Sequence, residues 1–167
     1  MTYSAPEPIG TNHVTTGFGC GRPALDRWLE RHALANDVTG RSRTFVVHRV
    51  DEARVVGFYC LSTSIVQYDE ATSRTREGLP RDEPVPAILL GRMAVDLKHQ
   101  SFGLGAGLLA DAIRRTHAIA TNAGVRVLLV HAKDEEARSF YLRWGFEPSP
   151  THELHLMLVM QDVDVLP

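Results

Sequence analysis

The stretch that decides the fold is "KHQSFGLGAGLLADAIRR", residues 98–115, in which glycines at 103, 105 and 107 open what is otherwise an amphipathic helix. Each glycine inside a helix costs about 0.5–1 kcal/mol relative to alanine. An apolar strand pattern, "AILLGRMAVD" (87–96), comes directly before it. A strand that runs into a glycine-rich turn and then a helix gathers unpaired N–H groups and the positive end of the helix dipole at one point, where phosphate binds.

The glycines have a second explanation, which is close packing of the helix on the sheet; Gly107, outside the core of the pattern, is assigned to packing. Two familiar phosphate-binding patterns do not fit the letters. A P-loop needs lysine and then serine or threonine after its last glycine, and a dinucleotide fingerprint needs its third glycine one position later. The residues alone therefore leave phosphate binding and packing open.

The rest of the chain predicts a single α/β (α+β) domain over residues 1–167, with a mixed, twisted central sheet and helices on both faces. Apolar spacing and turn residues indicate its elements. In order, these are a loose segment over 1–12, a helix over 20–37, a hairpin of strands over 43–50 and 54–63, a long irregular connection over 64–86, a strand over 87–96, a helix ending near Asn122, a strand over 125–132, a helix over 134–145 and a strand over 152–160.

Composition is that of an ordinary globular protein, with 44% hydrophobic and 23% charged residues and a net charge of −2. This balance gives no general attraction to nucleic acid, so a polyanion-binding surface must be local. No apolar run is long enough to cross a membrane, and the first residues lack the pattern of a signal peptide, so a cytoplasmic location is expected. Cys20 and Cys60 predict neither a disulfide framework nor a metal site.

Two motifs together resemble the GCN5-related N-acetyltransferase (GNAT) family. The first is Q-x-x-G-x-G from Gln100 to Gly105, and the second is "NAGVRVLLVHAKDEEARSFYLRWGF" over 122–146, with its Phe-Tyr-x-x-x-Gly-Phe ending. The motifs cover about residues 87–148. The resemblance implies a GNAT-like acyl-CoA N-acyltransferase fold that uses acetyl-CoA as co-substrate, without a metal.

A narrower resemblance links "CGRPALDRWLERHA" (20–33) and "LLGRMAVD" (89–96) to the acetyltransferase toxins of bacterial toxin-antitoxin systems. It implies acetylation of the α-amine of aminoacyl-tRNA, inhibition of translation and a ribbon-helix-helix antitoxin as partner, and it leaves a homodimer open. Two alternatives also stay open. One is an N-acetyltransferase acting on a small-molecule amine or a protein N-terminus, and the other is a non-catalytic acyl-CoA-binding module.

The GNAT resemblance also implies where acetyl-CoA contacts the chain. The pantetheine arm pairs like an extra strand with the backbone near residue 94, and the pyrophosphate meets the N–H groups of residues 102–106. The implied cofactor-binding residues are Met93, Ala94, Val95, Phe102, Gly103, Leu104, Gly105, Ala106, Asp134, Ala137 and Phe140. Many relatives carry glycine and a polar or basic residue where this chain has Ser101 and Phe102. This difference removes a side-chain contact to the phosphate, while the backbone N–H groups that bind it are unaffected.

Tyr141 matches the tyrosine that protonates the departing thiolate in the family. With a reference pKa of about 10, a tyrosine is neutral at pH 7 and has a proton to donate. Its alternative role is that of a core aromatic, because Phe140, Trp144 and Phe146 lie close in sequence. No general base is identified. Asp134 also fits a helix N-cap better than a catalytic group.

Contacts with tRNA phosphates require exposed basic side chains beside the acceptor site. The candidates are Arg27, Arg31, Arg41, Arg43 and Arg92, although each of them alone also fits a solvated surface charge. His131, His152 and His155 show no metal-ligand spacing and are expected to be ordinary strand positions.

Overall fold

The computed structural model describes residues 2–163, and its elements follow the predicted order. The helices are α1 (Pro23–Arg31), α2 (Ala33–Thr39), α3 (Ser73–Arg76), α4 (Leu104–Ala120) and α5 (Glu135–Arg143), with 3-10 turns η1 (Tyr68–Glu70), η2 (Leu97–His99) and η3 (Met160–Asp162). The strands are β1 (Glu7–Pro8), β2 (Arg43–His48), β3 (Val55–Val66), β4 (Val85–Val95), β5 (Val127–His131), β6 (Glu147–Pro148) and β7 (His155–Val159).

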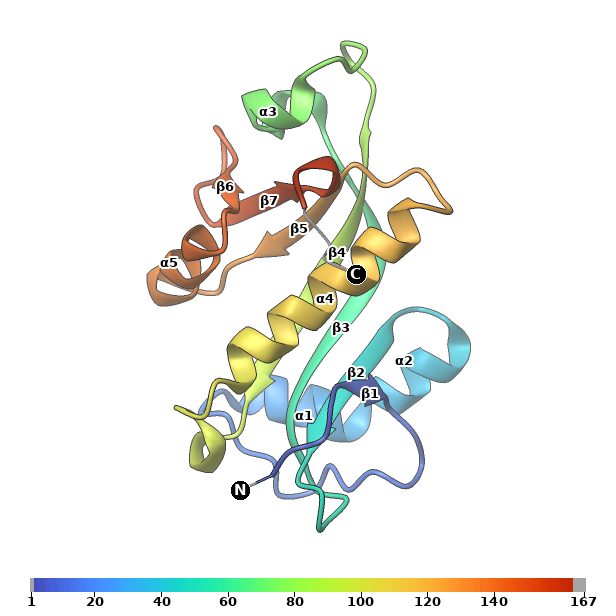
Figure 1. Cartoon of the computed structure of the whole chain (residues 1–167), viewed down its shortest axis with the longest axis vertical. Coiled ribbons are helices and arrows are strands. Elements are labelled where there is room, and N and C mark those ends of the chain that lie inside the picture. The colour runs from blue at the N-terminus through green and yellow to red at the C-terminus, as the bar shows by residue number, and fades with distance from the viewer. Residues whose placement is uncertain (1, 164–167) are drawn as a thin grey trace. The chain divides into compact units, whose positions relative to one another are not determined.

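The strands form a sheet in the order β1-β2-β3-β4-β5-β7-β6, whose elements are labelled in Figure 1. β4 and β5 are parallel, whereas β5 and β7 are antiparallel, so the predicted mixed sheet is confirmed. None of the helices in the described part of the chain is both long and apolar enough to cross a membrane.

Two compact units make up the chain. The first holds the residues up to Ser62 together with Gly91–Ala112, and the second holds Thr63–Leu90 together with the residues from Ile113 on. β3, β4 and α4 each run through both units. The single domain expected from the sequence stays a prediction.

In the first unit, the helix predicted over 20–37 is divided into α1 and α2 at His32. The backbone of His32 has φ −126° and ψ −25°, outside the helical region, although its N–H still bonds to Trp28 O at 2.9 Å. Leu29 and Ala33, on either side of the break, are both fully buried. The apolar spacing predicted which residues are buried but not this change of direction.

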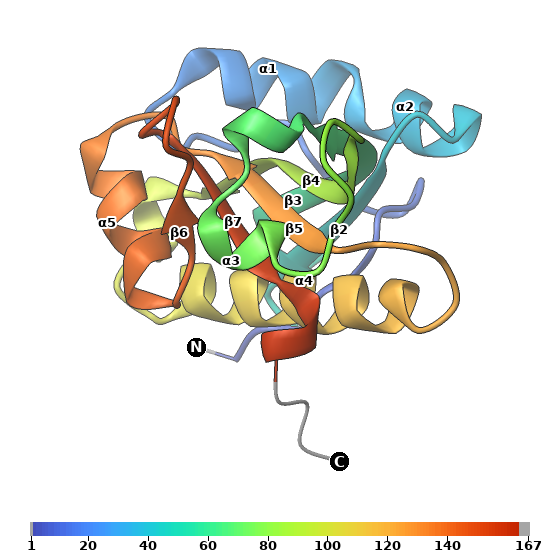
Figure 2. The ribbon, with the colours of Figure 1, turned by 90° about the horizontal axis from the view of Figure 1, so that it is seen from above.

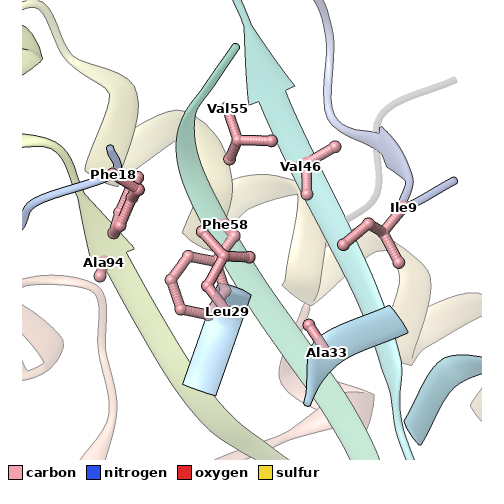
Figure 3. Packing of buried hydrophobic residues seen from close by; sticks show 8 residues of the cluster. All are labelled: Ile9, Phe18, Leu29, Ala33, Val46, Val55, Phe58 and Ala94. Atoms are coloured by element: carbon pink, nitrogen blue, oxygen red, sulfur yellow. The ribbon is translucent and has the colours of Figure 1, made fainter. Parts of the chain in front are cut away.

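A hydrophobic core lies between α1, α2 and the facing side of β1, β2 and β3. β2 and β3 pair antiparallel, and one extra residue in β3, opposite the step from Val47 to His48, lets Val55 and Phe58 share a face. Figure 3 shows the cluster, which consists of Ile9, Phe18, Leu29, Ala33, Val46, Val55, Phe58 and Ala94. Burial of these side chains, at about 25 cal/mol per Å² of apolar surface, holds the first unit together.

The first half of α4 packs on the other face of β3, and Figure 2 shows α4 below the strands. Gly57 permits this approach, because a Cβ built there would lie 3.2 Å from Leu108 Cδ1. The Tyr59 hydroxyl donates a hydrogen bond to the buried Asp111 carboxylate on α4. The absence of a side chain at Gly57 and the hydrogen bond between Tyr59 and Asp111 thus fix the position of α4 on β3.

The N-terminal segment, expected to be loose, is an edge strand of the first unit. β1 pairs antiparallel with β2, with Glu7 opposite Val46 and Pro8 opposite Phe45. The Ser4 N–H adds a bond to His48 O at 2.8 Å. Proline is compatible with an edge position, where it leaves no ladder bond unmade. The prolines of this segment are typical of an irregular edge strand. Its pairing with β2 depends on tertiary structure, which the local sequence does not predict.

In the second unit, β5 lies between β4 and β7, and its residues Val127–Val130 are buried on both faces. A core cluster forms on one face of these strands from Val66, Ala71, Val85, Ala87, Val127, Leu129, Met157 and Val159. α5 lies beside β6 in both views (Figures 1 and 2).

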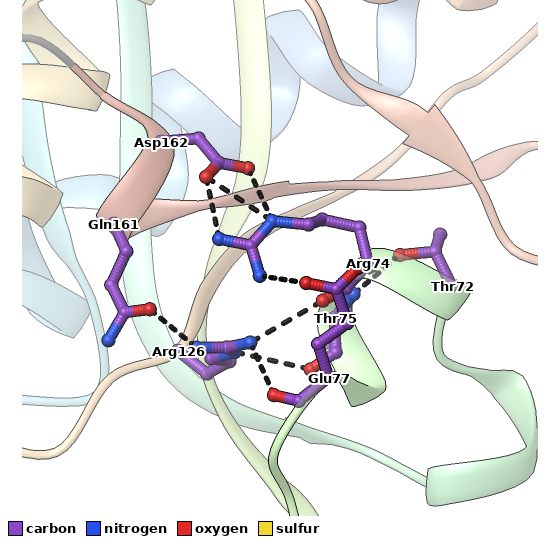
Figure 4. Close-up of polar contacts among 7 residues, drawn as sticks. All are labelled: Thr72, Arg74, Thr75, Glu77, Arg126, Gln161 and Asp162. Carbon is purple, nitrogen blue, oxygen red and sulfur yellow. Dashed lines mark hydrogen bonds and ion pairs between the residues drawn. The ribbon is translucent and has the colours of Figure 1, made fainter.

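The connection over 64–86 is more regular than predicted, since it contains the end of β3, η1 and α3. Figure 4 shows why: the Arg126 guanidinium donates to the carbonyl oxygens of Thr75 (3.2 Å) and Glu77 (3.0 Å) and to Gln161 Oε1 (2.8 Å). The Arg74 side chain binds the Asp162 carboxylate at 2.7 Å. One arginine distant in sequence thus satisfies the carbonyl groups where α3 ends.

Candidate active site

The glycine-rich turn joins the end of β4 to α4 within the first unit. Gly103 has φ 81° and precedes the first helical residue, Leu104, while Ser101 has φ 71°. Glycine adopts a positive φ freely, whereas serine does so at a steric cost. The first α-helical bond after the turn runs from Gly107 N–H to Gly103 O, at 3.1 Å. The N–H groups of the turn before it point out of the helix end.

Polar side chains hold both sides of this turn. Gln100, the first letter of the Q-x-x-G-x-G motif, donates from Nε2 to Val95 O at 3.1 Å. The Asp96 carboxylate accepts from the N–H of Lys98 at 2.9 Å and of Gly19 at 3.0 Å. The glutamine and the aspartate therefore fix the path of the chain from strand to helix.

The space around the glycines tests the packing explanation. Among the described residues, no atom outside the local backbone lies within 4 Å of a Cβ built at Gly103, Gly105 or Gly107. None of the three is required for close packing, so the packing explanation is wrong, and it is wrong for Gly107 in particular. Gly103 is explained by its positive φ, while Gly105 remains a helix-weakening residue with an open approach to the backbone.

The end of β4 carries three predicted coenzyme residues. Met93 and Val95 are half-buried, while Ala94 is buried in the core cluster of the first unit. In the second unit, β4 pairs with β5 from Ala87 to Leu90, and the strand then continues five residues further to Val95. Extended backbone at these positions agrees with the strand-like pairing that the family implies.

Tyr141 lies on α5 in the second unit and is 8% exposed. Burial raises the pKa of its hydroxyl to about 12. Its ring contacts Phe140 edge-on, with centroids 5.4 Å apart, and Phe146, with centroids 5.5 Å apart. The side chain thus belongs to an aromatic cluster and keeps its proton throughout the physiological pH range.

Three further predicted coenzyme residues belong to the same helix or its N-cap. Asp134 is the N-cap of α5, and its Oδ1 accepts a hydrogen bond from Ala137 N–H at 2.8 Å. This confirms the capping role that the sequence favoured. Ala137 and Phe140 are half-buried on α5. Their contact with acetyl-CoA, and that of Asp134, stays a prediction.

All five arginines predicted to bind tRNA lie in the first unit. Arg27 and Arg31 are exposed and one turn apart on α1, and Arg41 follows α2. Arg43 is partly engaged, because its Nη1 donates to Asp37 O at 2.6 Å. The Arg92 guanidinium lies 4.3 Å above the ring of Trp28 on α1, a cation–π contact that the sequence did not predict.

One group of side chains in the described part of the chain has the spacing of metal ligands: Glu7, His13 and His48. Glu7 Oε1 lies 2.8 Å from His13 Nε2 and 2.9 Å from His48 Nε2. His13 Nδ1 accepts from Gly10 N–H at 2.9 Å, so the proton of a neutral His13 sits on Nε2 and points at Glu7. The same nitrogen is then not a metal ligand, and the group is an ionic clamp on β1.

His48 completes this clamp with a second hydrogen bond to Glu7. Its Nδ1 lies 2.7 Å from Arg49 O and 3.0 Å from Glu52 O, so both ring nitrogens face acceptors. Burial lowers the pKa of His48, but these hydrogen bonds and Glu7 outweigh it, and the pKa is raised overall. The hydrogen bond from His13 is the largest cause of a lowered pKa for Glu7.

The clamp predicts a pH window for stability. Glu7, with a lowered pKa, stabilises the fold above the ordinary glutamate pKa of about 4.3, and this contribution is lost as pH falls through its folded pKa. His48, with a raised pKa, contributes fully below about 6.5 and loses its contribution as pH rises through its folded pKa. Urea unfolding of Glu7→Gln should therefore show its largest loss of stability between about pH 4.3 and 6.5. Glu30→Gln, an exposed change on α1, is the control, and a loss independent of pH would contradict the clamp.

The comparisons with known proteins agree with this geometry. A model of the acetyltransferase (GNAT) domain matches residues 40–148, which is more than half of the chain. The chain therefore belongs to the GNAT family of acetyltransferases, whose acyl donor is acetyl-CoA.

Relatives are found among toxins. The chain is 49% identical over 164 residues to the "tRNA-acetylating toxin" of Mycobacterium tuberculosis (strain ATCC 25618 / H37Rv), covering 98% of this chain and 96% of that protein. It superposes with a TM-score of 0.87 and 26% identity on AtaT complexed with acetyl-methionyl-tRNAfMet, covering 95% of each chain. A tyrosine-to-phenylalanine mutant of AtaT, bound to acetyl-CoA and the C-terminus of the antitoxin AtaR, matches with a TM-score of 0.81 and 25% identity, covering 96% of this chain and 95% of that one.

Proposed function

We propose that this chain transfers the acetyl group of acetyl-CoA to the α-amine of aminoacyl-tRNA and so inhibits translation as the toxin of a toxin-antitoxin pair. The observation that carries the proposal is 49% identity, over nearly the whole of both chains, to a tRNA-acetylating toxin. An antitoxin is the proposed partner, as AtaR is for AtaT. The proposed substrate makes the cytoplasm the place of action.

The glycine-rich turn is the proposed pyrophosphate cradle. The start of α4 offers N–H groups and the positive end of a 17-residue helix, and the open space at Gly105 lets a phosphate reach them. Phe102 is 53% exposed beside the turn and offers no charge, so backbone groups supply the hydrogen bonds. The residues present therefore fit a polyphosphate ligand.

Tyr141 is the proposed catalytic residue. Acetyl-CoA supplies a thioester carbonyl for the amine to attack and a thiolate that departs. Full proton transfer from Tyr141 to a thiolate, whose acid has a pKa of about 8.5, is uphill by on the order of 5 kcal/mol because the tyrosine pKa is about 12. Hydrogen-bond donation by the neutral hydroxyl to the charge developing on sulfur avoids this cost. The proton that the amine loses then balances the proton that the thiolate gains.

The acceptor amine needs little help from the chain. An α-amine has a pKa of about 7.7–8.0, against about 10.4 for a lysine amine, so a substantial fraction is neutral and nucleophilic near pH 7. We therefore assign no carboxylate as general base. The exposed arginines of α1 and the following loop, in contrast, are suited to phosphate contacts that bring a tRNA to the enzyme.

The test is transfer of labelled acetyl from acetyl-CoA to bulk aminoacyl-tRNA by the full chain. We expect label in the RNA fraction that mild alkali releases together with the amino acid as its N-acetyl derivative. Deacylated tRNA is the control, since it lacks the α-amine and should remain unlabelled. Labelling of a small-amine or peptide panel with none on aminoacyl-tRNA would instead establish the alternative acceptor, and binding of acetyl-CoA without transfer to any amine would establish a non-catalytic module.

A further inference from the structure

Three histidines of the second unit, expected to be ordinary strand positions, form a column of stacked rings. The centroids of His131 and His155 are 3.9 Å apart with 15° between the ring planes, and those of His155 and His152 are 4.7 Å apart with 29° between the planes. His155 is therefore the middle ring. His131 and His152 form the ends of the column.

Backbone structure holds the column in place. His131 ends β5 and lies directly opposite His155 on the antiparallel strand β7. The turn before β7 closes with a bond from His155 N–H to His152 O at 2.9 Å. Cross-strand pairing sets the first stack and this turn sets the second, so the arrangement follows from the fold rather than from a surface rotamer.

The column has accessible ends, and two of its three rings have lowered pKa values. His131 is exposed, and the side chain of His152 is 51% exposed with its Nε2 3.7 Å from Glu70 Oε1. Burial, followed by the neighbouring histidines, lowers the pKa of His131. Burial and His152 also lower the pKa of His155, although Glu70 opposes them. The lowered pKa favours the neutral form of both rings. His131, as an end of the column, has one ring face outside the histidine stack.

Metal binding does not explain this arrangement. In the part of the chain that the structure describes, the metal-ligand geometry is met by Glu7, His13 and His48 and not by the column. Rings stacked at 3.9 Å direct their nitrogens sideways, within their own planes, rather than toward a shared point between them. A further flat ring placed on an end of the column would continue the stack.

We propose that this histidine column is a stacking platform for an unpaired nucleobase at the 3′ end of the tRNA. The proposal rests on the function proposed above, because an aminoacyl-tRNA presents its amine at the end of a single strand. Proteins hold splayed-out bases by stacking them on aromatic side chains, histidine included, and such contacts tolerate any base. The platform deepens the assignment by naming the part of the substrate that this unit recognises.

The test compares the full-length wild type with His152→Ala and His155→Ala on aminoacyl-tRNA. We expect KM for aminoacyl-tRNA to rise by about 5- to 100-fold, the effect of losing one stacked base, with kcat and the KM for acetyl-CoA nearly unchanged. His152→Phe should restore KM, because phenylalanine stacks but does not titrate. His117→Ala, a histidine of α4 outside the column, is the matched control.

A second readout does not require turnover. An RNA hairpin that ends in a single strand with 2-aminopurine as its last base should lose fluorescence on binding the wild type, and should lose less with His155→Ala. Alanine variants within twofold of wild type in KM, together with unchanged quenching, would overturn the platform. The platform would also be overturned if His152→Phe kept a raised KM and its pH–rate profile shifted, because that result indicates a titrating role for His152. If the wild type quenches the 2-aminopurine fluorescence but acetylates no aminoacyl-tRNA, the proposed function is rejected and the stacking contact with the base still holds.

Discussion

Tyr141→Phe should lower kcat for acetyl transfer to aminoacyl-tRNA by about 10²- to 10⁴-fold, the usual effect of removing a positioned proton or hydrogen-bond donor. The exchange deletes one oxygen and keeps the ring in contact with Phe140 and Phe146. Packing, and with it the affinity for acetyl-CoA, should therefore change little. In cells, expression of the variant should permit growth where the wild type arrests it.

The measurement is single-turnover transfer at saturating acetyl-CoA, with binding followed separately by calorimetry. Tyr59→Phe is the matched control, because it removes the hydroxyl of a second buried tyrosine, the one bonded to Asp111. That change should lower stability and leave kcat within a few-fold. If Tyr141→Phe also stays within a few-fold of wild type, the tyrosine belongs to the aromatic core alone and the thiolate leaves without its help.

The raised pKa adds a condition on the pH profile. A tyrosine with a pKa of about 12 remains neutral well above pH 9, so its ionisation produces no alkaline decline in kcat there. On the acid side, the rate should fall as the substrate α-amine is protonated, below about pH 8. If the fall in rate below about pH 8 has the same midpoint in the slow Tyr141→Phe variant, it is caused by protonation of the substrate amine and not by the tyrosine.

Local patterns were sufficient for the longer strands β2, β3, β4, β5 and β7, for the glycine turn and for the N-cap at Asp134, but not for the two-residue strands β1 and β6. Each depends on residues close in sequence: alternating or continuous apolar runs, a strand-turn-helix order, and an aspartate before two glutamates. The break at His32 was not predicted, because the same apolar spacing is satisfied by one helix or by two. Propensity is a weak prior where tertiary burial of Leu29 and Ala33 decides the path.

Contacts between distant residues account for what the sequence missed. The order in the connection over 64–86 depends on Arg126, which lies some fifty residues from its partners Thr75 and Glu77. The histidine column depends on the register that sets His131 opposite His155. Spacing along the chain contains no signal for either. If the pairing of β5 with β7 were known, the position of His131 opposite His155 would predict the stacked rings.

Gly105→Val should raise the Kd for acetyl-CoA by roughly ten- to hundredfold, the loss expected when one or two hydrogen bonds to a charged group are blocked. Outside the local backbone, no described atom lies within 4 Å of a Cβ built at this position, so a side chain begins there in open space. Valine is at least as favourable as glycine inside a helix. The fold should therefore keep its stability while the anion loses its approach to the backbone.

Gly107→Val is the matched control, because Gly107 lies two residues further along α4 with equally open surroundings. Its Kd for acetyl-CoA should stay within about twofold of wild type, since that N–H already donates to Gly103 O. Gly105→Ala and Gly107→Ala should each add about 0.5–1 kcal/mol to the free energy of unfolding, because alanine favours the helix. Calorimetric binding and urea unfolding measure both quantities on the same samples. Equal loss of binding at 105 and 107 would contradict a local cradle, whereas loss at 105 alone assigns the helix-propensity cost of Gly105 to coenzyme binding.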